Sequence, residues 1–446
     1  MDKFKNAFLN KIFCENQEQY VLVYEEQRYT YDDLCNNVIN KINLLTNLGE
    51  INTIGIIGDY DFESISLFLA CIELNKIIVP FINENEISNK LTEVNCDIIL
   101  KGDEYQIQQK NHKNHDLIQK LINENKPGLI LFSSGSTGVP KAVVHNFEAI
   151  IDLHITKQYN PTKTLGIFLP DHIAGIDVML SVLGTGGSLV IPKSRKPKDV
   201  LEAMQRYKVE ILPASPTLLR LLTLSEMEKC DLDSLKLIVY GSERMDSNLL
   251  QFLQKILPNV RCKQSFGTSE TNAIKTRDHD TKEGYFKIMN CSYKILNNEL
   301  YLKSKTQALG YLNADNSVFD DEGYFATGDL VEVIHKNNEE YIKIIGRNKE
   351  VINVGGEKVL PQEVEGVLMQ IPFIQDCLVY GQSNPLTGQS VRVKIVLQKN
   401  ENLDALEAKK KIRMFCRDKL TSYKIPTKVE IVQKLEISER FKKVRR

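Results

Sequence analysis

The sequence predicts an α/β fold with a large N-terminal domain of layered αβ sheets and a small α+β C-terminal domain. The chain has 446 residues, which is more than one ordinary hydrophobic core accommodates. Apolar runs typical of buried strands alternate with helical patterns over most of its length. After about residue 346 the pattern changes to half-buried strands and one amphipathic helix. We therefore expect domains at residues 1–345 and 346–446.

The N-terminal part contains a βαβ pattern. Residues 53–57 and 77–80 are apolar runs typical of buried strands, and residues 62–74 between them have helical spacing. Two strands joined by a helix imply a parallel sheet that is covered by helices. Residues 101–127 are polar and rich in lysine, so we expect a surface excursion there.

Three further strands are expected at residues 165–170, 188–192 and 235–240. Each ends in small or polar residues, as the carboxyl ends of parallel strands often do beside a binding site. Near the C-terminus, residues 391–397 alternate like a half-buried strand, and residues 428–432 form another. Between them Asp404 is placed to cap a helix that extends to Leu420.

Composition narrows the class of protein. The formal net charge is −1, which gives no indication of nucleic acid or of an anionic membrane as partner. The nine cysteines include no CxxC pair, so a disulfide framework and a zinc ribbon are disfavoured, and reduced thiols in the cytoplasm are the simple interpretation. No apolar stretch is long enough for a signal peptide or a membrane helix.

The most informative segment is the loop Ser133-Ser134-Gly135-Ser136-Thr137-Gly138-Val139-Pro140-Lys141. It follows an apolar run at residues 129–132. Glycines let backbone N–H groups turn toward an anion, hydroxyls add donors, and the lysine adds a charge, so the loop suits a triphosphate. No Ser or Thr follows Lys141, so the Walker pattern is absent.

Several segments together resemble the adenylate-forming superfamily of acyl-CoA synthetases, nonribosomal-peptide adenylation domains and luciferases. The loop at residues 133–141 is similar to the family's phosphate loop. The other segments in family order are 264–270 (adenine and magnesium), 323–329 (ribose) and 346–365 (the hinge and the start of a mobile C-terminal domain). The resemblance runs from Tyr29 to the last residues.

The resemblance implies ATP and Mg²⁺ as cofactors and a small carboxylic acid as substrate. It assigns the phosphates to Lys141 and the loop residues Ser133, Ser136, Thr137 and Gly138. It assigns Mg²⁺ to Glu270 and Thr137. The nucleotide pocket is implied to include Gly241, Ser242, Glu243, Phe266, Gly267 and Ser269. Asp329 is implied to bind the ribose hydroxyls, with Arg347 assisting from the hinge.

A lysine near the C-terminus of the family bridges the substrate carboxylate and the α-phosphate. The chain ends Phe441-Lys442-Lys443-Val444-Arg445-Arg446. When Val444 and Arg446 are aligned with the family pattern, Lys443 is selected and Lys442 replaces a glycine. Lys443 is therefore our predicted catalytic lysine, and Lys442 is the alternative.

His172 in Asp171-His172-Ile173-Ala174-Gly175 resembles the histidine that gates the acyl pocket of acyl- and aryl-CoA ligases. Amino-acid-activating relatives carry an aspartate just after this position, where this chain has Ile173. A buried ammonium without a counter-charge is costly, so we expect an acid without an α-amine. Asp177 remains an alternative partner for an amine or hydroxyl.

The resemblance therefore predicts an AMP-forming acid–thiol ligase, which makes acyl-AMP and pyrophosphate and passes the acyl group to a thiol. Coenzyme A and a separate phosphopantetheinyl carrier protein both remain open as the acceptor. Two alternatives to the leading hypothesis are a stand-alone adenylation enzyme that loads a carrier protein and a nucleotide-binding protein that has lost catalysis.

Overall fold

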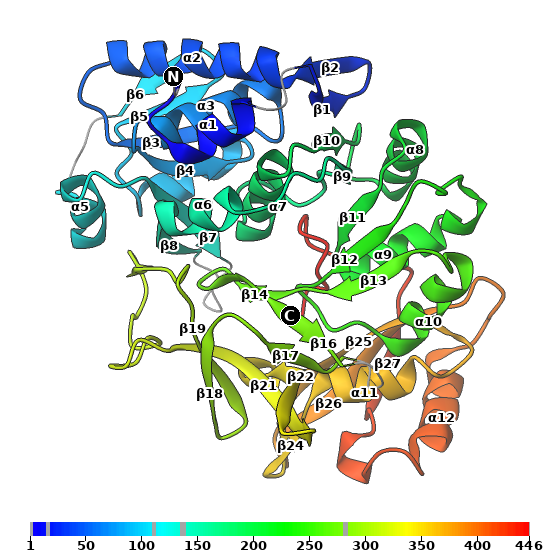
Figure 1. The fold of residues 1–446 in the computed structure, drawn as a ribbon. Coiled ribbons are helices and arrows are strands. Elements are labelled where there is room, and N and C mark those ends of the chain that lie inside the picture. The colour runs from blue at the N-terminus through cyan, green and yellow to red at the C-terminus, as the bar shows by residue number, and fades with distance from the viewer. Residues whose placement is uncertain (1–2, 15–17, 109–112, 134–139, 280–283, 446) are drawn as a thin grey trace.

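The computed structural model describes residues 3–14, 18–108, 113–133, 140–279 and 284–445. Figure 1 shows an N-terminal body of helices and sheets, with a C-terminal module coloured orange to red packed against it. The N-terminal body comprises residues 3–347 and the C-terminal module residues 352–445. The predicted boundary after residue 345 falls near the end of β22 (Glu339–Arg347), a strand of the N-terminal body, and stays a prediction.

Two seven-stranded sheets form the framework of the N-terminal body. The first has, in spatial order, β13 (Arg261–Gln264), β12 (Leu237–Tyr240), β11 (Ile211–Ala214), β9 (Lys163–Leu165), β10 (Ser188–Ile191), β1 (Tyr20–Tyr24) and β2 (Gln27–Thr30). The second has β20 (Gly310–Tyr311), β8 (Lys141–Asn146), β7 (Gly128–Ser133), β4 (Ile77–Phe81), β3 (Thr53–Ile57), β5 (Ile98–Lys101) and β6 (Glu104–Ile107).

The predicted βαβ unit is present. Strands β3 and β4 pair in parallel and are joined by α3 (Phe62–Glu73). Residues 101–127 are more ordered than the predicted excursion, because they include β6 and α5 (Asp116–Asn123). The strand predicted at residues 165–170 is wrong in position, because β9 ends at Leu165 and shares only that residue with it. The Arg195 side chain then takes the carbonyl of Ile167 at 2.9 Å, a bond that β-sheet pairing does not provide.

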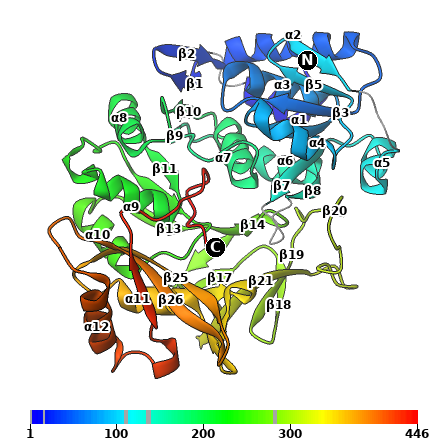
Figure 2. The same ribbon diagram turned by 180° about the vertical axis from the view of Figure 1, so that it is seen from behind.

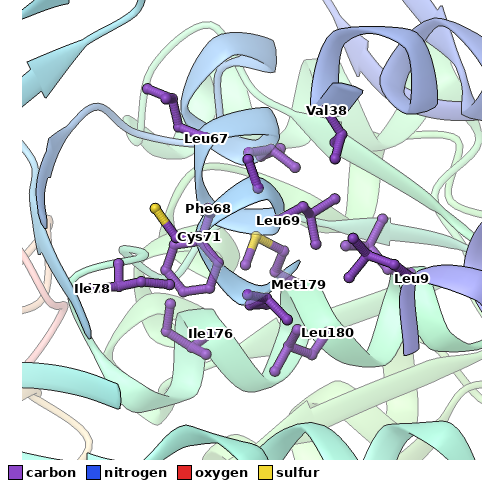
Figure 3. Packing of buried hydrophobic residues seen from close by; sticks show 14 of the residues in the cluster. Leu9, Val38, Leu67, Phe68, Leu69, Cys71, Ile78, Ile176, Met179 and Leu180 are labelled. Atoms are coloured by element: carbon purple, nitrogen blue, oxygen red, sulfur yellow. The ribbon is translucent and has the colours of Figure 1, made fainter. Parts of the chain in front are cut away.

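A large apolar cluster lies between the two sheets and draws residues from both. Figure 3 shows its centre, where α7 (Ile173–Gly184) packs against α3. The other helices of the body are α1 (Ala7–Cys14), α2 (Tyr31–Asn47), α4 (Ile87–Leu91), α6 (Phe147–Ile155), α8 (Pro197–Tyr207), α9 (Pro216–Leu224) and α10 (Ser247–Ile256). Since α7 is buried along most of its length, the side chains at its N-terminus have a rigid support.

A six-stranded sheet completes the N-terminal body and leads into the C-terminal module. Its spatial order is β16 (Thr276–Asp278), β17 (Phe286–Ile288), β22, β21 (Phe325–Lys336), β19 (Glu299–Lys303) and β18 (Ser292–Leu296). A separate pair, β14 (Phe266–Thr268) and β15 (Asn272–Ile274), is antiparallel.

The C-terminal module has a hydrophobic core of its own. Its five strands are β24 (Glu357–Val359), β23 (Ile352–Val354), β26 (Gly388–Leu397), β25 (Ile374–Asn384) and β27 (Lys428–Ile431), and its helices are α11 (Pro361–Leu368) and α12 (Ala405–Cys416). Asp404 caps α12 as predicted, in a capping box with Glu407, but the helix ends at Cys416 rather than Leu420.

All nine cysteines are free thiols, as predicted. Within the described ranges, every helix is too short or too polar to span a lipid bilayer.

Candidate active site

The turn from β7 to β8 forms one edge of the site. Antiparallel pairing places Ser133 directly opposite Lys141. The Asn313 side chain accepts a hydrogen bond from Ala142 N–H and donates one to the Pro140 carbonyl, each at 2.9 Å. These bonds fix the point at which the loop returns to the sheet. The predicted loop residues Ser136, Thr137 and Gly138 lie outside the described residues.

Tyr311 connects the loop lysine to the predicted magnesium ligand. The Lys141 ammonium lies 4.8 Å from the centroid of the Tyr311 ring, a distance at which the ring face attracts a cation. The Tyr311 hydroxyl donates to Glu270 Oε1 at 2.8 Å. Burial and the charge of Glu270 raise the pKa of Tyr311, so the phenol stays protonated and remains a donor. Lys141 and Glu270 are thus held on either side of one aromatic side chain.

Glu270 sits in the turn between β14 and β15. Its backbone N–H donates to Thr268 Oγ1 at 3.2 Å, and its carbonyl accepts from Ala308 N–H at 2.6 Å. In the described part of the chain no hydrogen bond or ion pair reaches Glu270 Oε2, and no group of three His, Cys, Asp or Glu side chains is placed to hold a metal. A single carboxylate fits Mg²⁺, which is usually bound by one or two carboxylates plus substrate phosphates.

The segment after β12 requires its glycine. A Cβ at Gly241 would lie 2.6 Å from the carbonyl oxygen of Ser265. The next residue, Ser242, has a left-handed backbone conformation with a φ of 66°, so the chain turns just before Glu243. The Glu243 carboxylate accepts from Thr217 Oγ1 at 2.6 Å and from Lys443 N–H at 3.2 Å. Glu243 therefore joins α9 to the C-terminal segment.

The predicted adenine segment lies on the β14–β15 pair. The Phe266 ring packs against Phe286 with centroids 5.3 Å apart. A Cβ at Gly267 would lie 2.4 Å from the Asn272 carbonyl oxygen, so this position also needs a glycine. Ser269 lies in the turn beside Glu270.

Asp329 and Arg347 face each other across β21 and β22. Arg347 Nε lies 3.0 Å from Asp329 Oδ1, and the Asp329 side chain is 4% exposed, whereas that of Arg347 is 54% exposed. Burial raises the pKa of Asp329, and the Arg347 charge opposes this shift. This ion pair lies at the last residue of β22, next to the C-terminal module.

His172 is the N-cap residue of α7. Its Nδ1 accepts a hydrogen bond from Ala174 N–H at 3.3 Å. Burial, together with the charges of Lys442 and Arg440, lowers the pKa of His172 to about 3. The imidazole is therefore neutral at physiological pH, and its ring adjoins the C-terminal segment.

The C-terminal segment enters the N-terminal body as a tight turn, the tail hairpin (residues 437–443). Figures 1 and 2 both show this red segment reaching into the body. Ser438 N–H donates to the Lys442 carbonyl at 2.9 Å. Phe441 has a φ of 51°, its side chain is buried in a second apolar cluster of the body, which includes residues of α8, α9 and α10, and its carbonyl accepts from Ser215 Oγ at 2.8 Å. The buried phenyl ring fixes the hairpin against α9.

The two adjacent lysines of the tail hairpin have different surroundings. Lys443 Nζ lies 2.6 Å from Asp376 Oδ1 and 2.9 Å from the Cys377 carbonyl, both in the C-terminal module. Burial opposes the Lys443 charge, but the carboxylates of Asp376 and Glu365 raise its pKa. The structure does not bring the Lys443 ammonium to His172.

Lys442, the alternative candidate for the catalytic lysine, lies beside His172. It lines a cavity of about 20 Å³ together with Ile167, Phe168, Leu169, His172, Ala174, Ser242, Glu439, Arg440 and Phe441. Burial and the nearby Arg347 charge lower the pKa of Lys442, while Glu243 and Asp329 oppose the shift. Among the described residues, none forms a hydrogen bond or an ion pair with its ammonium. The structure thus brings Lys442, His172, Arg347 and Asp329 together.

Comparisons with known proteins agree with this geometry. The family model described as "AMP-binding enzyme" matches residues 81–312, and the model described as "AMP-binding enzyme C-terminal domain" matches residues 363–442. The chain belongs to the AMP-binding enzyme family. Three curated proteins and two solved structures that are similar to this chain are described below.

Three of the curated relatives are coenzyme A ligases. A 2-succinylbenzoate–CoA ligase of Staphylococcus epidermidis is 26% identical over 96% of this chain and 94% of that protein. A 2-succinylbenzoate–CoA ligase of Bacillus subtilis is 27% identical over 71% of this chain and 68% of that protein. The 4-coumarate–CoA ligase 4 of Arabidopsis thaliana is 27% identical over 61% and 54%.

Two solved structures share the fold. The anthranilate CoA ligase AuaEII in complex with anthranoyl-AMP superposes with a TM-score of 0.81, at 20% identity, over 99% of this chain and 96% of that one. The o-succinylbenzoate CoA synthetase of Bacillus subtilis in complex with its acyl-adenylate gives a TM-score of 0.78, at 22% identity, over 99% and 97%. Together these comparisons confirm the predicted family, the fold class and the class of enzyme, an ATP-dependent acid–thiol ligase.

Sequence reasoning missed three side chains that organise the site of this AMP-binding enzyme. Tyr311 ends the short strand β20 and Asn313 follows it, and no local pattern distinguishes them. Arg440 precedes Lys442 by two residues, and no role was predicted for it. Each of these side chains donates a hydrogen bond to an acceptor that is distant in sequence: Glu270 for Tyr311, the Pro140 carbonyl for Asn313 and Asp171 for Arg440. Only the folded structure reveals these pairs.

Proposed function

We propose that this enzyme uses ATP and Mg²⁺ to activate a carboxylic acid without an α-amino group, and then transfers the acyl group to coenzyme A. The observation that carries the proposal is the meeting of cations from both parts of the chain. Arg347 belongs to the N-terminal body, and Lys442 arrives on the tail hairpin beside His172, where the Arg347 charge helps to lower the pKa of Lys442. Two anionic reactants need such cationic, preorganised surroundings to approach each other.

In the first step a carboxylate oxygen of the acid attacks the α-phosphorus of ATP. A new P–O bond forms, the bond to the β-phosphate bridge breaks, and pyrophosphate leaves with the electron pair. We assign the charge that steadies this transfer to Lys442 rather than Lys443. The Lys442 ammonium has no carboxylate partner in the described part of the chain, whereas Lys443 is neutralised by Asp376 at 2.6 Å. A cation already paired in this way has less attraction left for the reacting anions.

The nucleotide contacts are assigned as the resemblance implies. Glu270 and Thr137 would hold Mg²⁺, which neutralises charge on the phosphates when bound. Lys141 and Ser133 would bind phosphate oxygens, and Asp329 the ribose. Support comes from the Bacillus subtilis o-succinylbenzoate CoA synthetase, which was solved with ATP and a magnesium ion and shares this fold with a TM-score of 0.78.

The surroundings of Asp177 support an acid without an amine. Asp177 Oδ1 lies 3.4 Å from His154 Nε2, and Lys157 donates to Ser181, one turn further along α7, at 2.8 Å. The Asp177 carboxylate therefore faces His154 and the charge of Lys157; burial raises the pKa of Asp177, but these two neighbours outweigh it and hold the pKa below the usual value. His172 is neutral and Ile173 is apolar, so the start of α7 offers no counter-charge to an ammonium group.

The names of the relatives support coenzyme A as the acceptor. The Staphylococcus epidermidis relative that spans nearly the whole chain is named a CoA ligase. A phosphopantetheinyl carrier protein remains the alternative acceptor, and the mass of the thioester product distinguishes the two. The cytoplasmic location stays a prediction.

Acid-dependent exchange of labelled pyrophosphate into ATP tests the adenylation step. We would assay 2-succinylbenzoate, 4-coumarate, anthranilate, oxalate and benzoate, each with and without Mg²⁺. Exchange is expected with at least one acid, and coenzyme A should then convert that acid to a thioester. A protein that binds ATP but exchanges with no acid would support the catalytically silent alternative and contradict the proposal.

A further inference from the structure

Arg440 links the tail hairpin to the N-terminal body. Its Nη2 lies 3.0 Å from Asp171 Oδ2, and both terminal nitrogens lie 3.4 Å from the Phe132 carbonyl oxygen. The Arg440 side chain is 27% exposed and that of Asp171 is 4% exposed. The pair is shielded from water on the carboxylate side, so salt screens it less than a surface pair.

The receptor for Arg440 belongs entirely to the N-terminal body. Asp171 directly precedes the gate residue His172, and Phe132 directly precedes Ser133 at the start of the phosphate loop. Lys90 approaches the same oxygen of Asp171 at 3.7 Å. The other oxygen, Asp171 Oδ1, is buried and accepts no hydrogen bond from the described residues. Arg440 therefore supplies the shortest contact that this carboxylate makes.

The neighbouring cations of the tail behave differently. Lys443 binds Asp376, and Arg445 binds Glu365, with both acceptors inside the C-terminal module. These two pairs travel with the module if it rotates, whereas the Arg440–Asp171 pair crosses to the N-terminal body and must break. Arg440 is only two residues from Lys442, so the crossing pair also restricts where the Lys442 ammonium can lie.

We propose that Arg440 is a positioning residue whose ion pair with Asp171 holds Lys442 at the gate during adenylation and is released for the thiol step. The inference rests on the proposed function, because it assigns the pair to one of two half-reactions. It predicts that loss of the pair slows acyl-adenylate formation and leaves the transfer from a finished acyl-adenylate to coenzyme A nearly unchanged.

The kinetic test compares Arg440→Met, Asp171→Asn and the conservative Arg440→Lys with the unmodified enzyme. Pyrophosphate exchange with the most active acid of the panel is expected to fall about 10-fold or more in the first two variants, and Arg440→Lys should recover most of it. Thioester formation from synthetic acyl-adenylate and coenzyme A should stay within about twofold. An equal loss in both half-reactions, or no loss in exchange, would overturn the proposal.

A matched control is Arg206→Gln. Arg206 forms an ion pair with Glu26, and both residues lie in the N-terminal body away from the tail hairpin. This variant removes an arginine and its ion pair with a carboxylate at an exposed position, where the two side chains are 48% and 81% exposed, and is expected to leave both half-reactions unchanged. If it changed the two half-reactions as Arg440→Met does, the effect would be one of general charge and the proposal would fail.

Hydrogen–deuterium exchange without any ligand separates this inference from the proposed function. Backbone amides of residues 437–443 are expected to exchange about 10-fold faster in Arg440→Met and Asp171→Asn, because the hairpin leaves its receptor more often. If no acid supports pyrophosphate exchange, the proposed function fails, and the amide measurement alone decides on the anchor. Unchanged protection in both variants would overturn the anchor even in an active enzyme.

Discussion

The two sides of the active site are held by different kinds of interaction. On the side of the N-terminal body, backbone pairing sets the positions, with Ser133 opposite Lys141 and Asp329 opposite Arg347. On the tail side, no strand longer than an isolated bridge between Ile437 and Lys443 holds the chain in the described structure. One buried ring and a few ion pairs hold it instead. In a site assembled in this way, the nucleotide-binding residues can stay in place while the tail hairpin leaves and returns.

The comparison is tested most strongly at the two adjacent lysines. Lys442→Met is expected to reduce acid-dependent pyrophosphate exchange about 100- to 1,000-fold, because it removes the charge next to the reacting atoms. Lys443→Met should reduce it by less than about 10-fold, because it disturbs the anchoring to Asp376 and leaves Lys442 in place. Equal losses, or the larger loss in Lys443→Met, would return the catalytic role to Lys443.

Removal of the carboxylate on the fixed side should change the metal requirement. Glu270→Gln is expected to lower exchange about 100-fold and to raise the Mg²⁺ concentration that gives half-maximal rate about 10-fold. Tyr311→Phe is the matched variant, because it keeps the ring beside Lys141 and removes only the hydrogen bond to Glu270. Its Mg²⁺ dependence should move by less than about threefold. An unchanged Mg²⁺ requirement in Glu270→Gln would exclude this residue as a ligand.

Phe441 separates docking of the tail from stability of the fold. Phe441→Ala is expected to lower exchange about 10-fold while the melting temperature changes little, because the ring joins the tail to the body and neither core depends on it alone. Phe147→Ala is the contrasting variant, since Phe147 is fully buried within the body. It should cost about 3 to 5 kcal/mol of unfolding free energy. A loss of that size in Phe441→Ala would mean that the hairpin is part of the core.

The smallest effect concerns pH. The pKa of His172 is lowered to about 3 and that of His145 to about 4, in both cases chiefly by burial. Between about pH 6.5 and these values the unfolded imidazole binds a proton that the folded one does not bind. The free energy of unfolding therefore falls as the pH falls through this window, and above about pH 6.5 these groups have no effect.

His172→Asn keeps a side chain that can cap α7 and removes one titrating group. From pH 6.5 to pH 5, this variant should lose about 1 to 2 kcal/mol less stability than the unmodified protein. Denaturant unfolding at the two pH values measures the difference. Parallel pH profiles for the two proteins would show that His172 is not kept neutral in the fold.

Much of the fold could be predicted from sequence because local patterns determine it. The β3–α3–β4 unit and the Asp404 cap of α12 follow from periodicity and capping preferences. Strand β9 was predicted too far along the chain, since an apolar run does not reveal that the Arg195 side chain donates to the carbonyl of Ile167.

The tail side could be predicted only in part. The last six residues offer two adjacent lysines, and the family pattern can be placed in either register. What separates them is the left-handed backbone at Phe441 and the position of Asp376, more than 60 residues earlier in the chain. Asp171 and Arg440 are likewise far apart in sequence, so no local signal indicates that they pair.

The unpartnered ammonium of Lys442 has a consequence for how nucleotide affinity is measured. Moving this ammonium out of water is unfavourable until an anion arrives, so seating of the hairpin and filling of the site are thermodynamically linked. If bound ATP raises the equilibrium constant for insertion of the tail hairpin into the body by some factor, then insertion of the hairpin raises the affinity for ATP by the same factor. Sulfate or inorganic phosphate in a buffer would also bind near this ammonium and favour insertion of the hairpin. An apparent dissociation constant for ATP therefore has meaning only when the buffer anions are stated.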